Sequence, residues 1–310
     1  MKVTPSERLW FNGELVPWDE ARVHVLSHVI HYGSGVFEGL RAYATPRGPA
    51  LVGLEAHMDR LVDSAELIGL PLPYDCAALC RAVIETVQDT GHEACYVRPF
   101  AFRGYGELGV DPTNAPVDVA VAAFPSGSLM GSESLERGVD VGVSSWRRMA
   151  PDTHPAMAKA AGNYLNSQLV LVEAKRHGYA EGIVLDVDGF VCEGSGENIF
   201  FVRDGELWTP PLSASILPGI TRGYALQLAV DLGIPVHETR IPREMLYTSD
   251  ELFFTGTAAE VTPIRSVDGK AVGVGAPGPI TKRIQEAYFE VIQGRGEDRH
   301  GWLTYVREDR

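Results

Sequence analysis

Apolar residues in the first 124 positions form two helical patterns. In residues 54–70 they recur every three or four positions and leave Arg60 off the apolar face. The same spacing returns after Asp75, a residue type that caps helices, and ends near Gly91. Elsewhere the pattern changes to the alternation typical of strands. The predicted strands are a hairpin at 9–16 with Asn12-Gly13 as its turn, and residues 34–43, 96–102 and 117–124.

Predicted strands become more frequent after residue 137. They fall at 138–145, 182–187, 190–193, 198–202, 206–209 and 252–255, with Asp188-Gly189 and Asp204-Gly205 as tight turns. Helices are predicted at 164–176, 218–232 and 281–292. A Gly- and Ser-rich run opens the segment 125–136, which is typical of a linker. We therefore expect a mixed α/β (α+β) chain with an N-terminal α/β domain at 1–124, an interdomain loop at 125–136 and a C-terminal domain at 137–310.

Composition and net charge limit the kinds of partner that the chain is expected to bind. The chain has 310 residues and a formal net charge of −14, without a long basic run. An acidic chain of this kind is a poor candidate for binding nucleic acid or an anionic membrane surface. No apolar run approaches the length that spans a membrane, and the N-terminus lacks a secretory apolar segment. The four cysteines form no CxxC pair, so we expect free thiols in a reducing cytoplasm.

Three histidines share one predicted helical face. His24, His28 and His31 have the spacing of residues that could bind one metal ion. No acidic or thiol ligand accompanies them nearby, so we expect no metal here.

Lys159 has an unusual setting for a lysine. It lies in the run 156–166 between alanines, ahead of Gly162 and Tyr164. Burial among small apolar residues lowers the pKa of an amine toward its nucleophilic neutral form. The alternative is a helix start whose lysine extends into solvent.

Two further segments could bind an anion. Residues 217–222 open a predicted helix, where the first N–H groups and the Thr221 hydroxyl would face a negative group. Residues 256–258 follow a strand and could form a second concavity of N–H groups. Glu193 adds a carboxylate beside glycines that allow a ring to approach the backbone. A lysine, an acid, a phenol and a phosphate cradle are together what pyridoxal 5′-phosphate (PLP) requires.

The strand at 96–102 could form a pocket wall. Alternation places Tyr96, Arg98, Phe100 and Phe102 on one face, which suits a pocket better than a core. The alternative is an edge strand with a solvated arginine.

Four sequence motifs resemble those of the class IV aminotransferases, and more closely those of bacterial branched-chain amino-acid aminotransferases. They are AKAAGNYL at 158–165, EGSGEN at 193–198, LPGITR at 217–222 and GTAAEVTP at 256–263. YG at 32–33, FEG at 37–39 and YVRP at 96–99 favour the branched-chain group. The resemblance extends over residues 10–285, nearly the whole chain.

The resemblance implies a two-domain PLP fold of type IV, similar to that of D-amino-acid aminotransferase. Its smaller N-terminal domain is α/β, and its larger C-terminal domain contains a β-barrel-like sheet. The implied reaction is reversible transamination between L-leucine, L-isoleucine or L-valine and 2-oxoglutarate, which gives branched 2-oxo acids and L-glutamate. The implied protein is a homodimer or homohexamer in the cytoplasm, and the histidine run holds no metal.

The same resemblance implies roles for the cofactor residues. Lys159 would bind PLP covalently and, once released, move the proton between the substrate carbon and the cofactor. Glu193 would keep the pyridine nitrogen protonated, and Tyr164 would donate a hydrogen bond to the ring oxygen. The other implied cofactor residues are Leu217 against the ring and Arg60, Gly219, Ile220, Thr221, Gly256 and Thr257 around the phosphate.

Substrate contacts are implied in the same way. Tyr96 and the Thr257-Ala258 backbone would take the α-carboxylate, and Arg98 would accept the distal carboxylate of glutamate. The implied side-chain pocket consists of Phe37, Gly39, Tyr164 and Leu129, with Tyr32 and Val110 coming from a second subunit.

One departure from the family concerns substrate range. Its bacterial members carry tryptophan and tyrosine in the interdomain loop, where this chain has Ser126 and Leu129. We expect a wider pocket that tolerates larger or aromatic side chains. Two other activities share the fold, those of D-amino-acid aminotransferase and aminodeoxychorismate lyase. A metal- or phosphate-binding protein would need the histidines or the N–H groups, but not Lys159 and Glu193 together.

Overall fold

The computed structural model describes residues 3–125 and 131–306, which divide into two compact units. The first unit contains residues 3–125, 158–162 and 291–306, and the second contains residues 131–157 and 163–290. Each unit thus combines segments that are separated in the sequence, whereas the predicted domains are continuous. The predicted domain boundaries stay a prediction.

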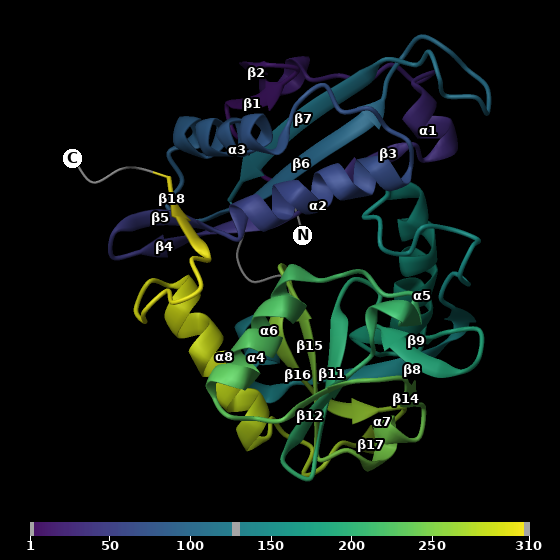
Figure 1. Ribbon diagram of the computed structural model, residues 1–310, viewed down its shortest axis with the longest axis vertical. Helices are drawn as coiled ribbons and strands as arrows, with labels where there is room; N and C mark the ends of the chain where they lie inside the picture. The colour runs from purple at the N-terminus through teal and green to yellow at the C-terminus, as the bar shows by residue number, and fades with distance from the viewer. Residues whose placement is uncertain (1–2, 126–130, 307–310) are drawn as a thin grey trace. The chain divides into compact units, whose positions relative to one another are not determined.

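The first unit is an antiparallel sheet with two helices packed against it (Figure 1). Its eight strands run in the order β18-β5-β4-β6-β7-β1-β2, with β3 paired to β6. The strands are β1 (Arg8–Phe11), β2 (Glu14–Pro17), β3 (Gly35–Phe37), β4 (Leu40–Thr45), β5 (Gly48–Val52), β6 (Cys95–Arg103), β7 (Val117–Phe124) and β18 (Leu303–Tyr305). The helices are α1 (His28–Tyr32), α2 (Leu54–Leu67), α3 (Cys76–Thr90) and a 3-10 turn at Trp18–Glu20.

The hairpin turn and the helix cap predicted in this unit are both present. The β1–β2 hairpin turns at Asn12-Gly13, both of which have positive φ, and the register pairs Phe11 with Glu14. Asp75 caps α3, because its carboxylate accepts a 2.7 Å hydrogen bond from Ala78 N. The apolar faces of α2 and α3, with Met58 and Val83 among their members, pack into one core with the sheet.

Two predictions in this unit need correction. The segment predicted as one strand at 34–43 forms two strands, β3 and β4, interrupted at Glu38 and Gly39. The interruption lets the Glu38 side chain enter the interior, where it is fully buried. The helix predicted through the histidine run begins only at His28, so His24 lies outside it.

The second unit is built around a closed barrel of six strands (Figure 1). Around the barrel the order is β11-β15-β16-β8-β9-β10, and the Glu193–Asn198 pair between β10 and β11 closes the ring. Four shorter strands extend the sheet. The strands are β8 (Val139–Arg147), β9 (Glu181–Leu185), β10 (Phe190–Glu193), β11 (Asn198–Arg203), β12 (Glu206–Thr209), β13 (Val236–Glu238), β14 (Ile241–Pro242), β15 (Glu251–Gly256), β16 (Glu260–Val267) and β17 (Lys270–Ala271).

Helices surround the barrel. They are α4 (Ser132–Arg137), α5 (Tyr164–Arg176), α6 (Ile220–Asp231), α7 (Met245–Thr248) and α8 (Pro279–Ile292), with 3-10 turns at Ala161–Asn163 and Leu212–Ala214. The predicted helices correspond to α5, α6 and α8.

Alternation along the barrel strands separates two apolar layers. Ile183 and Leu185 of β9 belong to one buried cluster with Phe254 and Ile264, while Val184 packs with Val170 of α5. The β-barrel-like sheet predicted from the family resemblance is confirmed. Strand β16, which joins β15 to β8, was not predicted from the sequence. Among the described residues, no helix is both long and apolar enough to span a membrane.

Candidate active site

Lys159 is held in the first unit by its main chain. Its N–H donates to Ser64 Oγ of α2 at 2.9 Å, and its carbonyl accepts from Phe37 N of β3 at 3.1 Å. Ala158 and Ala160 on either side are buried, while Lys159 itself is half-buried. The Lys159 Nζ lies 5.2 Å from the centre of the Phe37 ring. The small neighbours therefore anchor the backbone in the core, while Lys159 is not fully enclosed.

Arg60 differs from its predicted position off the apolar face of α2. The residue is buried, and its guanidinium forms two bonds to Glu38, from Nε to Oε1 at 2.6 Å and from Nη2 to Oε2 at 3.0 Å. His57, one turn earlier on α2, contacts Glu38 Oε2 through Nδ1 at 2.7 Å. A buried charge is tolerated when it is paired and hydrogen-bonded, which explains why an arginine occupies this interior position.

Strand β6 presents the predicted aromatic and cationic face. Arg98 Nη2 donates to the Tyr96 hydroxyl at 2.9 Å, and the Arg98 guanidinium lies 4.8 Å from the centre of the Phe37 ring. Phe100 stacks on Phe102. The edge-strand part of the alternative is wrong, because β6 pairs with β3 and β4 on one side and with β7 on the other. Its other part is confirmed, since Arg98 is exposed.

Gly39 allows Tyr96 to occupy its position. A Cβ atom on Gly39 would lie 1.9 Å from the Tyr96 hydroxyl oxygen, far inside van der Waals contact. Gly39 and Tyr96 are therefore matched in size, and a larger residue at 39 would displace the phenol.

Glu193 is the central carboxylate of the second unit. Its Oε1 forms an ion pair with Arg148 Nη2 at 2.7 Å. Its Oε2 accepts from Asn198 Nδ2 at 3.0 Å and from Leu217 N at 3.1 Å. Asn198 is the residue opposite Glu193 in the pair that closes the barrel. The closure of the sheet thus fixes the orientation of the carboxylate.

The N-terminus of α6 lies close to this carboxylate. Gly219 is the N-cap residue of α6, and no side-chain hydrogen bond caps this helix start. Thr221, in the first turn of the helix, is buried. A Cβ on Gly219 would lie 1.9 Å from Asn198 Oδ1, so only glycine fits between the helix start and the barrel. Helix N-termini attract anions through their first N–H groups and the helix dipole.

The other predicted anion-binding segment is the turn between β15 and β16. Residues 257–259 form this turn, and Gly256 pairs with Glu260 across it. Thr257 and Ala258 are half-buried. Tyr164 begins α5 in the same unit and is half-buried.

These observations fit the chemistry of PLP. A fixed carboxylate is the group that keeps a pyridine nitrogen protonated, and an uncapped helix start with a buried threonine suits a phosphate. In the first unit Lys159 is half-buried between two buried alanines, Ala158 and Ala160.

Three residues that help to build the site were missed in the sequence. They are Arg148, which pairs with Glu193, and Glu38 and His57, which pair with Arg60. Arg148 also donates from Nε to Ser215 O at 3.0 Å. Each of these contacts joins residues at least 19 positions apart, and no local pattern signals them. Glu38 lies in the FEG motif at 37–39, which was recognised without a role being given to this carboxylate.

The predicted pocket residues Tyr32 and Val110 lie on the surface of the first unit. Tyr32 is 44% exposed and Val110 is 85% exposed. His28 connects their segments, since its backbone N donates to Gly104 O and its Nε2 contacts Gly109 O. His31 contacts Val25 O. Ser126 and Leu129 lie outside the described residues.

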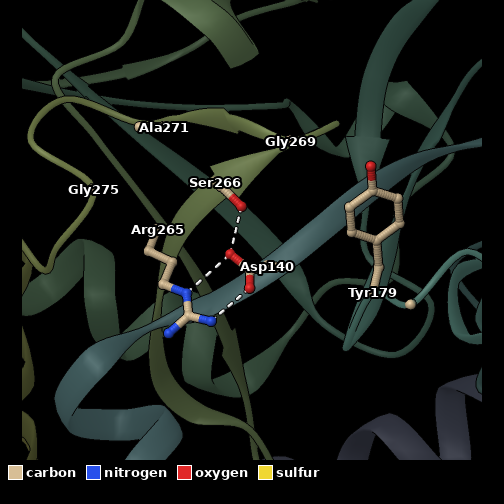
Figure 2. A pocket seen from close by; sticks show the side chains of 8 residues that line it. Asp140, Tyr179, Arg265, Ser266, Gly269, Ala271 and Gly275 are labelled. Atoms are coloured by element: carbon tan, nitrogen blue, oxygen red, sulfur yellow. Dashed lines mark hydrogen bonds and ion pairs between the residues drawn. The ribbon is translucent and has the colours of Figure 1, made fainter.

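A pocket of about 500 Å³ in the second unit is unrelated to the predicted site (Figure 2). None of its described lining residues is among the predicted cofactor or substrate residues. Its arginine, Arg265, is bound by the Asp140 carboxylate through Nε at 2.9 Å, and Ser266 donates to the same carboxylate. The hydrogen bond from Arg265 lowers the pKa of Asp140 to about 2. The Arg265 guanidinium is thus already paired with the neighbouring Asp140 carboxylate.

Comparison with known proteins identifies the class. The model of the amino-transferase class IV family matches residues 35–267. The chain is 50% identical over 309 residues to the branched-chain-amino-acid aminotransferase of Escherichia coli (strain K12), covering 99% of this chain and 100% of that protein. It is 45% identical over 299 residues to the enzyme of the same name from Pseudomonas aeruginosa, covering 96% and 97%.

Solved structures agree. The crystal structure of the Escherichia coli enzyme superimposes with a TM-score of 0.96 at 50% identity and covers 97% of this chain and 100% of that one. The branched-chain amino acid aminotransferase from Thermobaculum terrenum, solved in its PLP form, gives a TM-score of 0.91 at 34% identity, covering 98% and 99%. The chain belongs to the class IV aminotransferase family and is an enzyme. The resemblance to the branched-chain group and the predicted fold class are both confirmed.

Proposed function

We propose that this enzyme catalyses PLP-dependent transamination between L-branched-chain amino acids and 2-oxoglutarate. The observation that carries the proposal is the 50% identity over 99% of the chain to an enzyme named for branched-chain amino acids. The fixed Glu193 carboxylate and the half-buried Lys159 support it independently.

Lys159 is the catalytic residue in this proposal. When bound, PLP supplies an electron sink for the bond broken at the substrate α-carbon. The Lys159 amine would hold the cofactor and, once released, would carry the proton away from that carbon. The main-chain bonds to Ser64 and Phe37 fix the root of the side chain, so the amine moves over a restricted range.

The second unit supplies the groups that orient the ring. Glu193 would hold the proton on the ring nitrogen, and Arg148 pairs with the Glu193 carboxylate at 2.7 Å. Tyr164 would donate to the ring oxygen, and Leu217 would pack on the ring. The proposed phosphate ligands are Arg60 and the groups around Gly219, Ile220, Thr221, Gly256 and Thr257.

Substrate selection involves β6 and Gly39. Tyr96 and the Thr257-Ala258 backbone take the α-carboxylate. Arg98 lies beside the Phe37 ring and offers one cation on a largely apolar wall, which suits the distal carboxylate of glutamate. Branched aliphatic side chains are held by burial, at roughly 0.8 kcal/mol per methylene group. Arg98→Ala should therefore reduce turnover of glutamate far more than turnover of leucine, and an equal loss for both would contradict this role.

A second copy of the chain completes the pocket in this proposal. The surface around Tyr32 and Val110 also exposes Ile30, Tyr105 and Leu108, each at 55% or more. Large apolar side chains gathered on one surface are typical of a protein interface. A homodimer or a homohexamer would cover them, and mass measurement in solution distinguishes these from a fully active monomer, which would contradict the proposal.

The direct test of the proposed chemistry is Lys159→Ala. This variant should lose turnover and the covalent cofactor adduct that borohydride reduction traps in the wild type. Peptide mass mapping then identifies the labelled lysine, and labelling elsewhere would refute the assignment. Parallel assays with D-amino acids and with aminodeoxychorismate separate the other two activities of the fold.

A further inference from the structure

Glu38 connects the two segments that hold Lys159. It lies between β3 and β4, and its carboxylate is fully buried. Oε1 accepts from Arg60 Nε, while Oε2 accepts from Arg60 Nη2, His57 Nδ1 and Gly39 N. The carboxylate therefore ties the β3–β4 link to α2. The main chain of Lys159 is bound to the same two segments, at Phe37 and at Ser64.

The protonation states in this cluster are determined by burial and by the neighbouring charges. Burial alone would raise the pKa of Glu38, but the charge of Arg60 and the hydrogen bonds from Arg60 and His57 outweigh it and hold that pKa well below its usual range. Burial lowers the pKa of His57 despite the nearby carboxylate. His57 is therefore neutral at pH 7 and donates its Nδ1 proton to Glu38.

The bidentate bond fixes the plane of the Arg60 guanidinium. A carboxylate that contacts both Nε and Nη2 determines the direction of the whole planar group, which a single contact does not. Rotation about the long arginine side chain is thereby restricted before any ligand binds. Preorganised donors of this kind bind an anion without the entropic cost of ordering the side chain.

We propose that Glu38 is a positioning residue that orients the Arg60 guanidinium toward the cofactor phosphate. This inference rests on the proposed function, because it requires Arg60 to be a phosphate ligand. It goes beyond that function by assigning a role to a carboxylate that touches neither cofactor nor substrate. His57 supports the same carboxylate through its contact with Oε2.

Glu38→Gln is a targeted way to test the proposal. Three of the four donors converge on Oε2, so the amide oxygen of glutamine takes that position. Its NH₂ group then faces the Nε–H of Arg60, and two donors oppose each other. The substitution keeps the size of the side chain and removes the bond that fixes the guanidinium plane.

The experiment compares PLP with pyridoxal, which lacks the phosphate. Wild-type protein freed of cofactor, Glu38→Gln, Arg60→Lys and the control Glu55→Gln, at an exposed position of the same helix as Arg60, are titrated with each compound. Binding is followed by visible absorbance and by borohydride trapping on Lys159. Glu38→Gln should weaken PLP binding about tenfold, the size of one charge-assisted hydrogen bond, and pyridoxal binding less than about twofold. Glu55→Gln should bind both as the wild type does.

The outcomes separate the inference from the proposed function. Equal weakening for both compounds in Glu38→Gln would make Glu38 a general structural residue and overturn the inference. Unchanged or tighter PLP binding in Glu38→Gln, with weaker binding in Arg60→Lys, would overturn it while Arg60 remains a phosphate ligand. A wild-type protein that binds no PLP would overturn the proposed function itself. If Glu38→Gln does not fold, Glu38→Asp serves instead, since the shorter carboxylate cannot keep both bonds to Arg60 and the same selective loss of PLP is expected.

Discussion

Two buried carboxylate–arginine pairs, one in each unit, serve opposite purposes. In the first unit Glu38 has four donors around it, and the arginine that it fixes, Arg60, is the proposed ligand. In the second unit Arg148 is anchored to the Ser215 carbonyl and fixes Glu193, which is the proposed functional group. In one pair the acid orients the arginine, and in the other the arginine orients the acid.

The difference shows that an ion pair alone does not reveal which partner acts on a ligand. The surroundings of each carboxylate, including its other hydrogen bonds, distinguish the two cases. Glu38 is enclosed by His57 and the Gly39 N–H and is 0% exposed, so its role is to hold other groups. Glu193 lies at the closure of the barrel, beside the N-terminus of α6. The helix N-terminus favours the negatively charged phosphate of a ligand, and the carboxylate favours its protonated ring nitrogen.

The largest effect is expected at the functional acid. Glu193→Gln should leave PLP bound but slow proton removal from the substrate by orders of magnitude, because a charged partner of the ring nitrogen is lost. Single-turnover kinetics with L-leucine measures this step, and the cofactor content of the variant serves as its control. Wild-type rates in Glu193→Gln would show that the second pair has no catalytic role.

A loss of stability is expected at the positioning acid. Removing one partner of a buried ion pair costs about 3–5 kcal/mol, so Glu38→Gln should lower the free energy of unfolding by about this amount at pH 7. The folded-state pKa of Glu38 is depressed, so its contribution is fully present above the unfolded value of about 4.3 and is lost as pH falls through the folded value. The difference between variant and wild type should therefore shrink in acid. Denaturant unfolding at several pH values tests this, and a difference that grows in acid would contradict it.

The smallest effect is expected at a surface pair with similar geometry. Arg265 contacts Asp140 through Nε and Nη2, but the two side chains are 41% and 39% exposed. Exposed pairs contribute about 0–1 kcal/mol, so Asp140→Asn should change the free energy of unfolding by no more than that and leave turnover unchanged. A loss as large as that of Glu38→Gln would mean that geometry, and not burial, determines the stability of these pairs.

Much of the fold could be predicted from patterns within short stretches of the sequence. Asn12-Gly13 and Asp75 act through neighbours in the sequence, and helical periodicity identified α2, α3, α5 and α8. The strand β16 was missed although β15 directly precedes it across the turn at 257–259. Its other long partner, β8, is far away in the sequence.

The candidate site was predicted unevenly for the same reason. Lys159, Glu193 and Arg98 belong to recognisable motifs and were given roles. Glu38 also lies in such a motif, FEG at 37–39, but its role, like those of His57 and Arg148, depends on contacts made in the fold. Arg60 was assigned from the family resemblance, but its burial against Glu38 contradicts the helical pattern. A buried arginine can only be understood once its partner is known.

The visible absorption spectrum of the purified protein, before and after addition of L-leucine, tests the central claim most directly. We predict a yellow protein whose absorbance from lysine-bound PLP falls when L-leucine is added and returns with 2-oxoglutarate, while D-leucine has no effect. A protein that stays colourless with added PLP, or one that responds to D-leucine and not to L-leucine, would contradict the account.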